Sequence, residues 1–279
     1  MKSLLAGFSL FFCLNLLSAQ EVSLMTYNIR MSTESDGADA WSKRKEYLTS
    51  QVLFYAPDVM GVQEALPEQM DYLGKHLTGY KHIGVGREGK NKGEFSAIFY
   101  NANRLKVLED DTFWLSETPE KISTGWDAAL PRICTYALFK DKKSGEKFYV
   151  FNTHFDHVGI EARKNASALI LAKIKELNPK NLPAFVSGDL NLEPDSAPIA
   201  VLKTELDDTH DLAPNGAFGP IGTFNGFKFT EPVTRRIDYI FQAKSNNSKV
   251  LKHATLSDSK DLHYPSDHLP VYVLIDLKP

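Results

Sequence analysis

The sequence predicts an α/β (or α+β) fold built as a four-layer sandwich, in which two packed mixed β-sheets are flanked by helices. Strand-like segments outnumber helical ones, and the helical segments are few and scattered between them. Hydrophobic residues make up 43% of the 279 positions, and no repeat or low-complexity linker divides the chain. Strands interspersed with occasional helices favour two sheets packed together with helices on their outer faces.

The first 19 residues predict a secretory signal peptide. Lys2 is followed by an apolar stretch over 4–17 and then by the small residues Ser18 and Ala19. A transmembrane anchor needs about 20 consecutive apolar residues, and polar positions such as Asn15 interrupt this stretch. We therefore expect residues 20–279 to form one domain that is secreted or periplasmic, monomeric and without a transmembrane anchor.

Cysteine content and charge narrow the function. Removal of residues 1–19 would leave Cys134 as the one thiol, so the fold must be stabilised by its core without an internal disulfide. Lys and Arg number 32 against 35 Asp and Glu, a formal charge of -3 at pH 7. Tight nucleic-acid binders usually carry clustered positive charge. This balance favours a small substrate over nucleic acid, which stays an alternative.

The first part of the mature chain predicts two strand–helix pairs. Residues 22–29 are mostly apolar and uncharged, which is typical of a strand covered on both faces. Ser42 is the predicted cap of a helix that Pro57 stops. A short strand over 59–62 precedes a helix that opens with Pro67 in its first turn.

The remainder is rich in predicted strands. Turns rich in Gly, Asn, Asp and Lys separate those in the middle of the chain, at 80–85, 95–100, 104–108, 134–139 and 148–155. A helix is predicted from about Ile160 to Leu177, and three further strands at 184–186, 233–241 and 271–275. The segments 116–131 and 207–226 are long and turn-rich, as functional or disordered loops often are.

His154 lies near the end of the strand predicted at 148–155. Strand alternation puts Asn152, His154 and Asp156 on the same face. A lone histidine at a sheet rim is often structural, but these polar neighbours favour a functional role.

Asp189 and Asn191 directly follow the buried strand predicted at 184–186. Because they are two positions apart in extended chain, both side chains can point to the same place, and Gly188 permits a close backbone approach. It is an equally good interpretation that Asp189 and Asn191 simply form a turn.

Asp238 interrupts the apolar run 237–241, where an unpaired carboxylate would be costly. Arg235 and Arg236 are its candidate structural partners, whereas a histidine partner would indicate catalysis. His268, next to Asp267, lies just before the last predicted strand, although this segment could also be a surface loop.

Asn28 and Glu64 each follow a predicted strand and offer oxygen ligands. Such ligands suit Mg²⁺ or Mn²⁺ better than zinc or copper. Each residue alone is weak evidence. The ordered set of Asn, Glu, His, Asp-x-Asn, Asp and Asp-His, each beside a strand, is stronger.

This ordered set resembles the endonuclease/exonuclease/phosphatase superfamily, including a secreted bacterial branch of it. Six strings match family motifs in order along the mature chain, namely Thr-Tyr-Asn-Ile at 26–29, Gln-Glu at 63–64, Asn-Thr-His-Phe at 152–155, Gly-Asp-Leu-Asn at 188–191, Arg-Ile-Asp-Tyr-Ile at 236–240 and Ser-Asp-His at 266–268. The resemblance implies a four-layer sandwich with its site at the rim where the two sheets meet. It says little about substrate, because one scaffold hosts many chemistries.

The resemblance also implies a role for each residue. Asn28 and Glu64 would bind Mg²⁺ or Mn²⁺, with Asp267 near the ion. Asp189 would orient or deprotonate the attacking water, and Asn191 would hold that water or a phosphate oxygen.

His154 and His268 would contact the scissile phosphate, and Asp238 would orient one of these two histidines. Arg132, which matches a position of the secreted branch, and Arg163 are candidate substrate-binding residues. A surface salt bridge is an alternative role for Arg132.

The implied activity is metal-dependent hydrolysis of a phosphodiester or phosphomonoester by in-line attack of water. The alternatives are a secreted nuclease and a catalytically inactive binding module. A sugar phosphate, an inositol phosphate, a phospholipid headgroup and a nucleic acid all remain candidate substrates.

Overall fold

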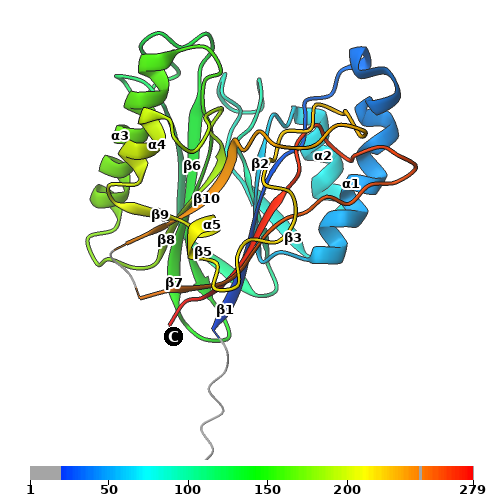
Figure 1. Cartoon of the computed structure of the whole chain (residues 1–279). Coiled ribbons are helices and arrows are strands. Elements are labelled where there is room, and N and C mark those ends of the chain that lie inside the picture. The colour runs from blue at the N-terminus through cyan, green and yellow to red at the C-terminus, as the bar shows by residue number, and fades with distance from the viewer. Residues whose placement is uncertain (1–19, 245–246, 279) are drawn as a thin grey trace, which may run out of the picture.

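A computed structural model describes residues 20–244 and 247–278, which form two six-stranded sheets packed face to face (Figure 1). The first sheet has the strand order β11 (Lys249–Thr255), β12 (Val271–Asp276), β1 (Glu21–Asn28), β2 (Val59–Gln63), β4 (Ile98–Asn101) and β3 (Tyr80–Ile83). The second has the order β5 (Leu105–Trp114), β6 (Ile133–Asp141), β7 (Lys147–His154), β8 (Ala184–Asp189), β10 (Asp238–Ala243) and β9 (Leu206–Asp208). Both sheets contain parallel and antiparallel pairs.

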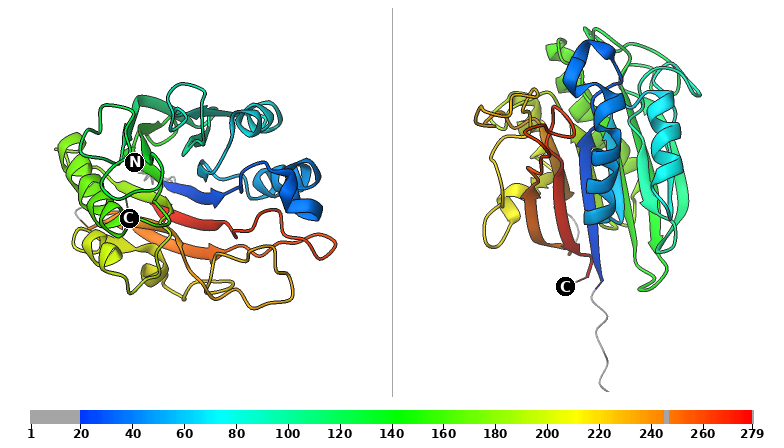
Figure 2. Two further views of the ribbon diagram at one scale, coloured as in Figure 1. Left: turned by 90° about the horizontal axis from the view of Figure 1, so that it is seen from above. Right: turned by 90° about the vertical axis from the view of Figure 1, so that its right-hand side faces the viewer.

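Helices cover the two outer faces. Helices α1 (Trp41–Tyr55) and α2 (Pro67–His76) lie on the first sheet, whereas α3 (Ile160–Leu177) and α4 (Ala197–Leu202) lie on the second, as Figure 2 shows. The short helices η1 (Glu34–Asp39) and α5 (Thr209–Leu212) lie in connections. The predicted four-layer sandwich is therefore confirmed.

Three apolar clusters fill the spaces between the four layers. In β1, Val22 and Leu24 point into the core between the sheets, while Met25 and Tyr27 pack under α1 and α2. Successive strand residues face opposite sides, so a strand covered on both sides must be apolar at nearly every position. This explains why β1 lacks the polar alternation of an exposed strand.

The structure departs from the predicted elements in places that carry weak sequence signals. Helix α1 begins at Trp41, and no side chain caps it, so the prediction of Ser42 as its cap was wrong. Strand β11 was not predicted because it is an edge strand interrupted by exposed lysines. The segment 207–226 contains α5, and the strand predicted from 233 begins only at Asp238.

The topology brings the functional segments to one edge of the sandwich. Strands β1 and β2 run parallel, as do β7 and β8, so the carboxyl ends of each pair lie together. Strand β10 runs antiparallel to β8, and its first residue, Asp238, is paired with Asp189. Strand β12 runs antiparallel to β1, so the residues just before β12 reach the same edge.

A buried polar seam joins the two sheets beneath this edge. Asn152 of β7 donates hydrogen bonds from Nδ2 to the carbonyls of Val62 and Ala97, both at 2.9 Å. Its Oδ1 accepts a 2.7 Å hydrogen bond from Gln63 Nε2. Gly61 makes room for this contact, because a Cβ there would lie 2.3 Å from Asn152 Oδ1. The sheets are thus held in register by polar contacts as well as by packing.

The predicted signal peptide, residues 1–19, lies outside the described residues. Within the described ranges, no helix combines the length and the apolar character needed to cross a membrane. Cys134 is a buried free thiol.

Candidate active site

Asn28, at the end of β1, lies at the centre of the polar cluster. Its Nδ2 donates hydrogen bonds to Glu64 Oε1 at 3.0 Å and to Asp189 Oδ2 at 2.9 Å, and it lies 3.5 Å from His268 Nε2. Its Oδ1 accepts a hydrogen bond from the Arg30 amide. Asn28 therefore links residues that are far apart in the sequence and are supplied by both sheets.

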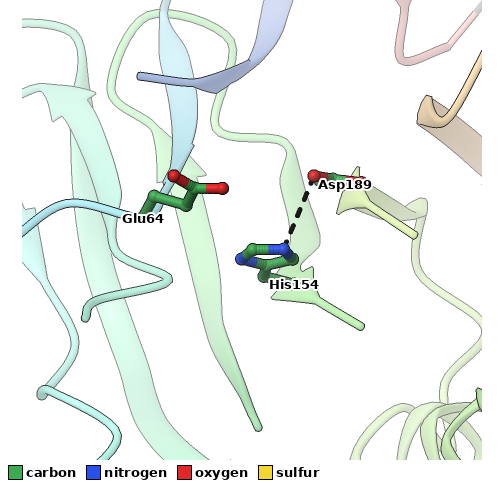
Figure 3. Close-up of side chains that lie close together, drawn as sticks. All are labelled: Glu64, His154 and Asp189. Atoms are coloured by element: carbon green, nitrogen blue, oxygen red, sulfur yellow. Dashed lines mark ion pairs between the residues drawn. The ribbon is translucent and has the colours of Figure 1, made fainter. Parts of the chain in front are cut away.

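Glu64 directly follows β2 and adopts a left-handed backbone conformation, with φ of 60°. This conformation is uncommon for residues other than glycine. Glu64 Oε2 accepts a hydrogen bond from the Met31 amide at 3.1 Å. Figure 3 shows its carboxylate pointing toward His154 and Asp189.

His154 and Asp189 are paired neighbours at the ends of β7 and β8. His154 Nε2 lies 3.5 Å from Asp189 Oδ2 and 3.1 Å from Asn191 Nδ2, which is placed to donate to it. The strands meet closely because Gly188 has φ of 148°, and a Cβ there would lie 2.0 Å from the Thr153 carbonyl oxygen. The expected close approach at Gly188 is thus present.

Of the partners that the sequence left open for Asp238, His268 is the one that it contacts. Asp238 Oδ2 lies 2.8 Å from His268 Nδ1, and both side chains are buried. Arg236 instead forms an ion pair with Asp208 at 2.8 Å. His268 Nε2 faces the polar cluster around Asn28 and lies 3.8 Å from Asp189 Oδ2.

The environment separates the protonation states of the two histidines. Burial, reinforced by Arg132 and His268, lowers the pKa of His154 well below its ordinary value. Burial acts in the same direction on His268, but Asp238 and Asp189 outweigh it and raise the pKa of His268 well above its ordinary value. The surroundings thus favour the neutral form of His154 and the protonated form of His268.

The pKa of the Asp189 carboxylate is raised above that of an exposed aspartate. Burial raises its pKa to about 7, the negative charge of Asp238 adds to this rise, and His268 opposes it. Asp189 can therefore exchange a proton near neutral pH.

Asp267 and Glu64 flank Arg30 at the mouth of the cluster. The Arg30 guanidinium lies 3.9 Å from Asp267 Oδ2 and 3.8 Å from Glu64 Oε2, distances too long for hydrogen bonds. Its close partner is Asp36, at 3.0 Å.

The cluster opens into a cavity of about 400 Å³. Arg132 lines it, next to His154, whereas Arg163 does not; Arg163 donates a 3.2 Å hydrogen bond to the carbonyl of Asp156.

The acidic residues that line this cavity are Glu64, Glu94, Asp189 and Asp267. The basic ones are Arg30, Arg87, Arg132, Arg235 and His268, whose pKa is raised. The lining thus has one more basic than acidic group, and a divalent cation and a phosphate dianion bound together would leave this difference unchanged.

The side chains present fit a hard divalent cation. Ligand atoms of Glu64, His154 and Asp189 all lie within 4.8 Å of one another, and those of Asp189, Asp238 and His268 form a second such group. The carboxylates of Glu64 and Asp267 are the donor type that Mg²⁺ and Mn²⁺ prefer. Asn28 presents its amide nitrogen to the carboxylates, so its oxygen would face an ion only after the amide turns over.

Sequence reasoning did not single out Arg44, which holds two site segments together. This buried helix residue donates to the carbonyls of Ile29, Arg30 and Pro265 at 2.6, 2.7 and 3.0 Å. A cation in the first turns of a helix, where surface charges are common, carries no distinguishing signal. His157 also lines the cavity and was not singled out, although it follows the polar face of β7.

Comparison with known proteins gives an independent view of this site. The sequence model of the "Endonuclease/Exonuclease/phosphatase family" matches residues 25–268, a range that holds every site residue discussed above. A crystal structure of a protein of this family from Bacteroides thetaiotaomicron is 36% identical, with a TM-score of 0.87 over 91% of this chain and 97% of that one.

Two further relatives differ in activity. A mannosyl-6-phosphatase from Bacteroides thetaiotaomicron is 36% identical, with a TM-score of 0.85 over 91% of this chain and 99% of that chain. Tyrosyl-DNA phosphodiesterase 2 from Danio rerio is 26% identical over 176 residues, which are 62% of this chain and only 42% of that protein.

Proposed function

The chain belongs to the endonuclease/exonuclease/phosphatase family, whose members hydrolyse phosphoester bonds, and on this premise we propose that it is a divalent-metal-dependent phosphatase of a small phosphomonoester. The observation that carries the proposal is the convergence on Asn28. Asn28 Nδ2 donates hydrogen bonds to both Glu64 and Asp189. The same nitrogen lies 3.5 Å from His268 Nε2. An inactive binding module would have no need for this arrangement of acid, base and carboxylate ligands.

Glu64 and Asp267 would hold Mg²⁺ or Mn²⁺, with Asn28 as a third ligand once its amide oxygen is turned inward. The bound ion would supply positive charge that polarises a phosphoryl oxygen. Arg30 would move away from these two carboxylates when the ion binds. This movement would break no hydrogen bond to Glu64 or Asp267, and the ion pair of Arg30 with Asp36 would be kept.

The residues of the chain would perform the proton transfers. Asp189 accepts a proton from the water that attacks phosphorus, as its buried carboxylate is close to its titration point at neutral pH. Protonated His268, held by Asp238, gives a proton to the departing alcohol oxygen as the phosphorus–oxygen bond breaks. Asn191 orients the neutral ring of His154 beside the phosphoryl group. No covalent enzyme intermediate is required.

Three observations support a small monoester over a nucleic acid. The cavity of about 400 Å³ suits a small ligand. Its lining mixes four acidic with five basic groups, and the whole chain is slightly acidic, whereas tight nucleic-acid binders usually carry clustered positive charge without such an acidic complement. The similar protein from Bacteroides thetaiotaomicron is a mannosyl-6-phosphatase, which favours a sugar phosphate as substrate.

We also propose that the protein is exported, since residues 1–19 have the charge, apolar run and small residues of a signal peptide. Mass spectrometry of the protein recovered from the expressing cells should give an amino terminus at Gln20. An intact Met1 terminus on the folded, active protein would contradict export by cleavage.

The enzymatic proposal is tested with metal-depleted protein and matched substrates. We expect p-nitrophenyl phosphate to be hydrolysed faster than bis(p-nitrophenyl) phosphate or an oligonucleotide, and only after Mg²⁺ or Mn²⁺ is added. The ion should also raise the unfolding temperature of the wild type but not that of Glu64→Gln, while the exposed-site control Glu231→Gln should behave as the wild type. Full activity in chelator, or no activity with any ion, would refute the proposal, and a preference for the oligonucleotide would indicate a nuclease.

A further inference from the structure

His157 is an exposed histidine on the wall of the active-site cavity. It lies in the connection between β7 and α3, three residues after His154. None of the acid, base or metal-binding steps proposed above uses it.

A line of contacts holds this histidine in place. Asp156, which is buried, accepts hydrogen bonds from the amides of Val158 at 2.9 Å and Gly159 at 2.8 Å. Its other oxygen pairs with Arg132 Nε at 3.3 Å. Arg132 is also buried, and its Nη2 lies 3.0 Å from His157 Nδ1.

This arrangement selects one tautomer of His157. A guanidinium group can only donate hydrogen bonds, so the Nδ1 atom that meets Arg132 must be an acceptor. The proton of the neutral ring is therefore on Nε2. His157 presents to the cavity a hydrogen-bond donor whose orientation is fixed by a buried ion pair.

Depth within the cavity indicates which part of a substrate His157 would meet. The reactive residues are nearly inaccessible, with exposed fractions of 7% for His154, 1% for Asp189 and 4% for His268. The phosphoryl group must reach these buried residues, so the alcohol part of the substrate extends toward the more exposed wall. The Arg132–Asp156 pair behind His157 has no net charge, which suits a neutral hydroxyl group better than an anion.

We propose that His157, positioned by Arg132, determines specificity by donating a hydrogen bond from its Nε2–H to a hydroxyl group of the alcohol part of a sugar phosphate. This inference rests on the proposed phosphatase function and adds to it a residue that recognises the sugar. It also accounts for Arg163, whose bond to the Asp156 carbonyl supports the same line of contacts from α3.

Two substitutions separate the two nitrogen atoms of the ring. His157→Asn keeps an acceptor near the position of Nδ1, facing Arg132, but removes the donor at Nε2. His157→Gln can place an amide N–H near the position of Nε2. His76→Asn, at an exposed histidine on α2, is the matched control. Each variant is assayed with Mg²⁺ on mannose 6-phosphate and on p-nitrophenyl phosphate, whose alcohol part has no hydroxyl group.

We expect His157→Asn to raise the KM for mannose 6-phosphate about tenfold, the effect of one lost hydrogen bond, with kcat nearly unchanged. Its KM for p-nitrophenyl phosphate should change less than twofold, and His157→Gln should recover most of the loss. Equal losses on both substrates, no loss on either, or a wild type that does not prefer mannose 6-phosphate would overturn the inference. Hydrolysis of p-nitrophenyl phosphate by the wild type would leave the phosphatase proposal standing in each of these cases.

Discussion

Replacing Asp238 with asparagine should slow turnover by up to about 150-fold and leave the protein folded. Asp238 Oδ2 lies 2.8 Å from His268 Nδ1 in a buried pair. Asparagine has nearly the same shape, and its Oδ1 can still accept a hydrogen bond from His268 Nδ1–H, so the ring keeps its orientation. The substitution removes the negative charge that keeps His268 protonated as the proposed proton donor.

The expected size of the effect follows from this contact. A hydrogen bond with a charged partner contributes about 1.5–3 kcal/mol, and each 1.36 kcal/mol corresponds to about tenfold in rate. Because asparagine keeps a neutral bond, the loss cannot exceed this whole contribution, so the decrease in kcat should be at most about 150-fold, with little effect on KM.

The assay is steady-state hydrolysis of p-nitrophenyl phosphate by Asp238→Asn, His268→Ala and the double variant, with thermal unfolding as the check on folding. If Asp238 acts through His268, the double variant should be no slower than His268→Ala alone. Unchanged kcat in Asp238→Asn, or losses that multiply in the double variant, would refute this reasoning.

Three other substitutions test separate parts of the structure. Asp189→Asn should lower kcat by at least about 10²-fold, because the proposed proton acceptor is lost; near-native turnover of the folded variant would contradict the assignment. Arg44→Met should lower the free energy of unfolding in urea by about 2–4 kcal/mol and also reduce kcat, because the segments carrying Asn28 and His268 lose their shared anchor; a stable variant of normal activity would show that this anchor is dispensable. Burial, aided by His210 and Arg236, lowers the pKa of His253 to about 3. Protons therefore bind more tightly to the unfolded chain, and stability that is complete above about pH 6.5 should fall with decreasing pH by up to about 1.4 kcal/mol per unit. Urea unfolding at pH 5 and pH 7 should show a smaller difference in His253→Asn than in the wild type, and an equal difference would rule out His253 as the source.

The location of the site was predictable because strand ends are visible in the sequence. Asn28, Glu64, His154 and Asp189 each end or directly follow a strand that contains an apolar run, and parallel pairing brings such ends to one edge. Placing polar residues at these positions costs no core packing. The pattern therefore survives in the sequence even though the residues are distant along the chain.

The pairing of charges was not predictable, because it depends on elements with little sequence signal. Arg236 was a candidate partner for Asp238, yet it pairs with Asp208. Asp208 belongs to the three-residue edge strand β9, which is too short to be recognised by its periodicity. Only with β9 in place is Arg236 neutralised and Asp238 left to His268.

Arg163 illustrates the same limit in a helix. Its position in the first turns of α3, close in sequence to the polar end of β7, suggested contact with substrate. Its side chain instead meets the carbonyl of Asp156. Sequence proximity to a site thus does not distinguish a residue that contacts a ligand from one that braces the backbone behind it.

The Asn152 seam restricts how this enzyme can admit its substrate. One sheet carries Asn28 and Glu64, the other carries His154 and Asp189, and sliding between them would break the bonds of Asn152 in a dry interior. Relative motion of the two sheets is therefore suppressed. Substrate entry and product release must depend on movement of the loops around the cavity. Hydrogen–deuterium exchange should accordingly be slowest at the Val62 amide, which donates to Ala97, and much faster in the loops around the mouth.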